Sequence, residues 1–152
     1  MTLEQQLQII IDDAANYGVS PVVVAKAIAP VLKSFATQLK KLEYYILQNL
    51  ENEWVLTTIV NPQLQEKRVI YAFTSVRDAA NFQGKDNLDL AAVPISVVQL
   101  LFRLFSLQQV DSIIFFDEPQ NFQRGVEISR SQLSQLIKQQ LESLNKTPPD
   151  IA

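Results

Sequence analysis

The chain has 152 residues, of which 47% are hydrophobic and 19% are charged, and its formal net charge at pH 7 is −3. This composition predicts one folded domain with a hydrophobic core. The sequence contains no histidine and no cysteine. Their absence excludes Ser-His-Asp and Cys-His catalysis, disulfide bonds, and metal sites built on His or Cys ligands. The acidic charge argues against nucleic-acid binding, because nucleic-acid-binding proteins usually carry a basic surface.

The sequence shows no sign of secretion or of a membrane span. The first residues lack the positive charge of a signal peptide. No apolar run approaches the length of about 20 residues that crosses a bilayer. We therefore expect a cytoplasmic protein that has no membrane partner.

Residues 1–42 predict a helical hairpin. Apolar residues recur at steps of three and four along both halves of the segment, which places them on one face of each helix. Thr2 and Gln5 form a capping box, and Gly18 is a typical helix stop. Pro30 should kink the second helix, because proline cannot donate a hydrogen bond to the preceding turn.

The next part of the chain predicts β-strands. Two runs are rich in β-branched and aromatic residues, Trp54–Val60 and Arg68–Phe73, which indicates an antiparallel meander. Residues 43–50 fit two structures. Their bulky side chains favour a strand, but Ile46 and Leu50 also continue the helical spacing of the hairpin.

The remaining sequence alternates between helix and strand. Three helices are predicted, each opened by a serine that stands three residues before Asp or Gln: Val76–Phe82, Ser96–Leu107 and Ser129–Asn145. Two strands are predicted, Leu88–Ile95 and Ser112–Phe116. Pro94 indicates that the first strand lies at a sheet edge or ends at the proline, and the continuous apolar run of the second indicates the sheet centre. Residues 83–87 and 118–125 are predicted loops.

These elements predict an α+β fold, a mixed sheet of about five strands that is covered by helices and preceded by the helical hairpin. The hairpin, residues 1–42, is expected to pack on a core formed by residues 43–145. Residues 146–152, with two adjacent prolines, are expected to be a flexible tail.

One strand ends in a pair of acids that resembles a metal site. An apolar strand followed by Asp117-Glu118 resembles the Walker B element, in which a carboxylate helps to hold Mg²⁺. No glycine-rich phosphate loop accompanies it, and adjacent side chains on a strand point in opposite directions. We therefore favour a structural turn, with these two acids as the only metal candidates, and we assign no catalytic residue and no cofactor. Gly125 is expected to supply a positive φ angle nearby.

The predicted helix at residues 96–107 is almost entirely apolar. Its polar residues Gln99, Arg103 and Ser106 form one narrow stripe, whereas a surface helix normally has a broad polar face. The helix is either buried within the monomer or covered by a partner subunit. In the second case the interface consists of Val98, Leu101, Phe102 and Phe105. Arg103 should lie at the solvent edge or pair with a carboxylate.

Short motifs between Trp54 and Leu141 resemble the SseB N-terminal-like domain. They are Val69–Ser75, which ends in Phe-Thr-Ser, then Asp78-Ala79, Val93–Ser96 and Arg124–Ile128. The turn at Pro119–Asn121 departs from the order found in that family. The resemblance implies a mixed α and β domain that is associated with protein interaction rather than turnover, with the helical hairpin as an addition. The whole chain is also similar to cyanobacterial proteins.

The sequence therefore predicts a non-enzymatic protein-interaction or scaffolding module that forms a homodimer or binds another protein. Two alternatives stay open. One is a Mg²⁺-dependent phosphoryl-transfer or hydrolytic enzyme that uses Asp117 and Glu118. The other is a regulatory domain that binds a small ligand.

Overall fold

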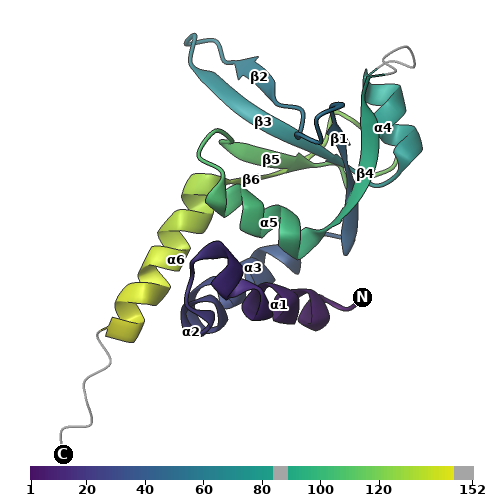
Figure 1. Ribbon diagram of the computed structural model, residues 1–152. Coiled ribbons are helices and arrows are strands. Elements are labelled where there is room, and N and C mark those ends of the chain that lie inside the picture. Colours follow the sequence, from purple (N-terminus) through teal and green to yellow (C-terminus); the bar gives the residue numbers. More distant parts are fainter. Residues whose placement is uncertain (84–88, 146–152) are drawn as a thin grey trace, which may run out of the picture.

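The fold is that of a computed structural model, which describes residues 1–83 and 89–145 (Figure 1). The strands of this part of the chain form one mixed, six-stranded sheet with helices packed against it, so the predicted α+β fold is confirmed. The helices are α1 (Leu3–Asp12), α2 (Pro21–Val23), α3 (Ala29–Ala36), α4 (Val76–Gln83), α5 (Val97–Ser106) and α6 (Arg130–Asn145), with a 3₁₀ turn η1 (Ala14–Tyr17) and a π-helical turn η2 (Val24–Ile28). The strands are β1 (Glu43–Gln48), β2 (Thr57–Val60), β3 (Glu66–Phe73), β4 (Ala91–Ser96), β5 (Ser112–Phe115) and β6 (Val126–Ser129). The predicted tail at 146–152 and nearly all of the predicted loop at 83–87 lie outside the described residues.

The long strand β3 organises the sheet. The strand order is β4-β1-β3-β5-β6, and β2 pairs with β3 as well. Val69 pairs with both β2 and β5, and Ala72 pairs with both β1 and β5, so β1 and β2 share one edge of β3. The β3–β5 pair is parallel and the others are antiparallel. In Figure 1, β2 and the first half of β3 extend beyond the other strands, and we call residues 57–69 the hairpin arm.

The N-terminal segment follows its predicted signals closely. Thr2 and Gln5 form the reciprocal capping box, and Gly18 adopts a φ angle of 71° at the end of the 3₁₀ turn. The amide of Ala29 bonds to the carbonyl of Val24, five residues back, immediately before Pro30. The π-helical turn thus accommodates the proline that we expected to kink the helix.

The strand predictions are confirmed in part. The second helix ends at Ala36, and residues 43–48 form strand β1, so the strand alternative holds. The meander prediction is confirmed in part. The run Trp54–Val60 pairs antiparallel with the end of β1 at Trp54 and with β3 through β2, but β1 also pairs directly with β3. Within the predicted second strand, residues Thr57–Val60 form β2, and Trp54 makes an isolated antiparallel bridge to Gln48. Strand β6 was not predicted, because four residues are too few to show a clear alternation.

The main core lies between the sheet and the helices α1, α3, α5 and α6, with α5 packed against both the sheet and the N-terminal helices. Val98 and Leu101 are fully buried, Phe102 is buried and Phe105 is half-buried. Burial within the chain therefore explains the apolar sequence of α5, and the predicted interface residues Val98, Leu101 and Phe102 are buried within the chain. In the described part of the chain, no helix is long and apolar enough to cross a bilayer.

The second face of the sheet is only half covered. Helix α4 covers a cluster of aromatic side chains whose ring centroids lie 4.7–6.0 Å apart. This cluster consists of Tyr71, Phe73, Phe82, Phe116 and Phe122. No described helix packs on the other half of this face, where the first residues of β3 and β5 meet the last residues of β6.

Candidate functional site

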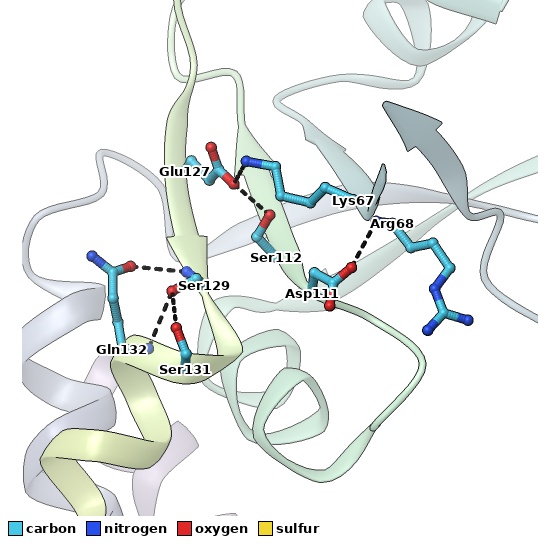
Figure 2. Close-up of polar contacts among 8 residues, drawn as sticks. All are labelled: Lys67, Arg68, Asp111, Ser112, Glu127, Ser129, Ser131 and Gln132. Carbon is cyan, nitrogen blue, oxygen red and sulfur yellow. Dashed lines mark hydrogen bonds and ion pairs between the residues drawn. The ribbon is translucent and has the colours of Figure 1, made fainter. Parts of the chain in front are cut away.

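The uncovered half of the sheet forms a hollow of about 530 Å³. Its walls come from the hairpin arm on one side and from the junction of β6 and α6 on the other, and its polar groups include Lys67, Asp111, Glu127 and Ser129 (Figure 2). Small-ligand sites are mostly apolar and enclosed. This hollow is charged and open, so the hydrogen bonds of its polar groups decide what it can do.

Glu127 is the centre of the polar contacts in the hollow (Figure 2). Its Oε2 atom lies 2.6 Å from the Nζ atom of Lys67 and 2.6 Å from the Oγ atom of Ser112. Burial alone would raise the pKa of Glu127, but the hydrogen bonds from Lys67 and Ser112 and the charge of Lys67 outweigh it and lower that pKa. A carboxylate with a lowered pKa is a poor general base at neutral pH. The three side chains therefore tie β3, β5 and β6 together.

Other polar groups beside the hollow also bond to one another. The N–H of Arg68 donates to Oδ2 of Asp111 at 2.8 Å, and this carboxylate caps β3 where β5 begins. Ser129 and Gln132 form the predicted capping box of α6, with N···O distances of 3.1 and 2.9 Å. These contacts are structural, and they leave the hollow without a group that is poised for catalysis.

The two predicted metal candidates point to different partners. Asp117 is buried and accepts hydrogen bonds from the hydroxyl of Tyr44 and, at 3.2 Å, from the N–H of Lys40. Glu118 instead accepts from the side-chain amide of Asn121 at 2.9 Å. Residues 1–83 and 89–145 contain no group of three or more acidic side chains arranged to hold a metal ion. The arrangement is that of a structural turn.

Gly125 has a different role from the one that we predicted. In the described residues the only glycine with a positive φ angle is Gly18. A Cβ atom on Gly125 would lie 2.4 Å from Cγ2 of Ile114 and 3.3 Å from Cε1 of Phe116. Glycine is required there because the backbone approaches these two side chains closely.

Arg103 is half-exposed, which fits the predicted position at the solvent edge of the helix, and its partner is an aromatic ring rather than a carboxylate. Its guanidinium carbon lies 4.1 Å from the ring centroid of Trp54, which is the geometry of a cation–π contact. Sequence reasoning missed this pair because the two residues lie on separate elements with no local signal that joins them.

Asp78 is a buried acid whose main role was also missed. The sequence predicted only its part in the cap of α4, where its N–H donates to Oγ of Ser75 at 3.0 Å. Its carboxylate also accepts the N–H of Gln120 at 3.0 Å, and Gln120 has a φ angle of 63°. Asp78 thus holds the loop after β5 in a left-handed backbone conformation that glutamine rarely adopts.

The edge strand β4 is protected by Pro94. The N–H of Val97 donates to the carbonyl of Leu42, which fixes which residues of β4 face β1. Because bonded positions alternate along an antiparallel ladder, Ala92 and Pro94 direct their backbone groups away from β1. Proline has no N–H, so this outer edge lacks a donor there. The predicted edge position of Pro94 is confirmed.

The edge strand β6 is protected by its sequence and by α6. The N–H of Arg130 donates to the carbonyl of Asp111, so Glu127 and Ser129 turn their backbone groups outward. The N–H of Ser129 is already bonded to Gln132. Glu127 brings a charge to the strand, and charges on an edge oppose pairing with another strand.

The outer edge of β2 has no such protection. The N–H of Asn61 donates to the carbonyl of Gln65, so Thr58 and Val60 direct their N–H and C=O groups away from β3. Residues 55–60 contain no charge and no proline. Within the described ranges no strand pairs with this side of β2. The β2 edge, which we define as the outward side of Thr57–Val60, is thus open, uncharged and rich in β-branched residues.

Comparison of the chain with protein-family models, curated proteins and solved structures finds no match. The resemblance to the SseB N-terminal-like domain therefore stays a prediction, and the site is interpreted from its geometry alone.

Proposed function

We propose that the chain is a non-enzymatic protein-interaction domain that binds its partner by adding a strand to the β2 edge. The observation that carries this proposal is the contrast between the three outer strands of the sheet. Pro94 removes an outward N–H from β4, and the Ser129–Gln132 cap and the charge of Glu127 protect β6. On β2, in contrast, the outward N–H and C=O groups of Thr58 and Val60 have no strand partner among the described residues. An unprotected edge is a template for another strand. Strand addition is also a recurrent mode of peptide recognition.

The hairpin arm is rigid enough to serve as such a template. The Oδ1 atom of Asn61 accepts the N–H groups of Gln63 and Gln65 at 3.0 and 2.9 Å, and its side-chain amide donates to Gln65. The same pattern recurs at the Asn49 turn that precedes the arm. A binding edge that is ordered before the partner arrives loses less conformational entropy when it binds.

The alternative functions gain less support. A Mg²⁺-dependent enzyme would need Asp117, whose carboxylate already accepts hydrogen bonds from Tyr44 and Lys40. A small-ligand domain would use the hollow, in which Lys67 and Glu127 neutralise each other. The cytoplasmic location stays a prediction.

Selection of linear peptides from a random display library tests the proposal. The expected binders are extended, β-branched peptides whose binding is lost in Thr58→Pro, because proline removes an outward N–H that the β2–β3 ladder does not use. The matched control is Ala92→Pro, which removes an outward N–H from β4. Peptides that bind Thr58→Pro as tightly as the parent chain would contradict the proposal.

A further inference from the structure

We infer that the strand added to β2 is the β2 strand of a second copy of this chain, in a two-fold antiparallel arrangement centred on Ile59. The inference rests on the proposed function, since it names the partner of the same edge. It follows from the backbone pattern of β2, from its lack of charge and from the exposed apolar side chains around it.

The backbone of β2 matches its own copy. Thr58 and Val60 both face outward, so Thr58 of one copy can exchange both backbone hydrogen bonds with Val60 of the other. The two-fold axis generates the same pair a second time. All outward N–H and C=O groups of both residues then find partners. Ile59 lies opposite itself in a non-bonded pair, in which Cα atoms approach to about 4.5 Å.

The charge pattern allows this pairing at β2. A two-fold antiparallel strand pair places Ile59 opposite its own copy and Thr58 opposite Val60, so a charge near the axis would lie close to the same charge of the other copy, which destabilises a strand pair. Residues 55–60 carry no charge. Glu127 places a charge on β6, and Pro94 removes a donor from β4.

Exposed apolar side chains surround the same edge. The exposed fractions are 77% for Leu50, 39% for Leu56, 53% for Val60 and 83% for Leu64. In the antiparallel arrangement the hairpin tip of one copy runs toward the start of β2 in the other. Leu64 thereby approaches the part of the second copy that carries Leu50 and Leu56. Association would remove from water apolar surface that the single chain leaves exposed.

Sedimentation velocity of the purified chain over a range of concentrations provides the first test. The expected result is a dimer that dissociates on dilution, becomes monomeric in Thr58→Pro and persists in Ala92→Pro. A chain that stays monomeric at all concentrations, or a dimer that survives in Thr58→Pro, would overturn the inference.

Engineered cysteines test the register, and the chain contains no natural cysteine to confuse the result. Ile59→Cys should form a disulfide-linked dimer on mild oxidation, because the facing Cα atoms fall within the range of about 4.4–6.8 Å that a disulfide spans. Thr57→Cys is the control. Its two copies are offset by four residues, or about 13 Å along the strands. Efficient cross-linking of Thr57→Cys, or failure of Ile59→Cys to cross-link, would overturn the arrangement.

The two proposals can fail separately. If the chain is monomeric but still binds selected peptides, and Thr58→Pro abolishes this binding, the inference of a second copy is wrong and the proposed function holds. A monomeric chain that binds no peptide at this edge would overturn both.

Discussion

The hydroxyl of Tyr44 donates a hydrogen bond to the buried carboxylate of Asp117, joining the start of β1 to the segment that follows β5. The N–H of Lys40 donates to the same carboxylate, so the turn after α3 is held there as well. The acid that most resembled a metal ligand in the sequence thus fixes the connection between the N-terminal helices and the sheet.

The pKa of Tyr44 predicts a loss of stability in alkali. Burial raises this pKa, and the hydrogen bond to Asp117 and the charge of Asp117 raise it further. An unfolded tyrosine titrates near pH 10, so the contribution of Tyr44 to stability is complete below about pH 10 and is lost as the pH rises toward the folded value.

Ultraviolet absorbance of tyrosinate measures this effect, because the chain has only four tyrosines. One tyrosine should ionise only as the fold is lost, and this late fraction should be missing in Tyr44→Phe. Complete ionisation of the folded chain would contradict the assignment.

Gly125→Ala should destabilise the fold by about 1–3 kcal/mol, because the new methyl group overlaps Cγ2 of Ile114. Urea unfolding measures the loss of free energy. In an Ile114→Ala background, which removes the opposing atom, the same substitution should cost markedly less. Equal costs in both backgrounds would mean that close packing is not the reason for glycine at this position.

Arg103→Ala should cost about 0.5–1 kcal/mol, the value of a partly exposed cation–π contact. Trp54 is the only tryptophan, so its fluorescence reports the loss of the stacked guanidinium directly. The exposed Arg77 on α4 provides a control, and Arg77→Ala should leave the emission unchanged. An unchanged emission spectrum in Arg103→Ala would contradict the stacked arrangement.

The lowered pKa of Glu127 predicts a small loss of stability in acid. The contribution is present above the unfolded value and is lost as the pH falls through the lower folded value. Both partners of the ion pair are more than one-third exposed, so solvent and salt screen it to well below about 1 kcal/mol. Glu127→Gln should remove this part of the acid dependence of urea unfolding. If the free energy of unfolding of the mutant falls in acid as much as that of the parent chain, Glu127 is not the source of this acid dependence.

Most local signals in the sequence are confirmed, although Gly125 lacks the positive φ angle expected of it, and long-range signals are absent. The capping boxes at Thr2 and Ser129, the stop at Gly18 and the edge position of Pro94 all depend on neighbouring residues, and each is confirmed. The pairing of Trp54 with Arg103 depends on how distant elements meet, and no spacing within the chain encodes it.

The candidate site shows the same division. The run Trp54–Val60 predicted a strand, but its position at an open edge depends on which side of β3 it occupies. The protection of β4 and β6 likewise depends on which of their backbone groups face outward, and only the hydrogen bonds of Val97 and Arg130 in the structure fix this.

Amide hydrogen exchange at Thr58 and Val60 tests strand addition at the β2 edge most directly. With the edge occupied by a selected peptide or by a second copy, both amides should become strongly protected, and the outward amide of Ala92 on β4 should exchange rapidly throughout. On dilution without a peptide, the protection of Thr58 and Val60 should disappear. Exchange at Thr58 and Val60 as rapid as that of Ala92 under every condition would contradict strand addition at this edge.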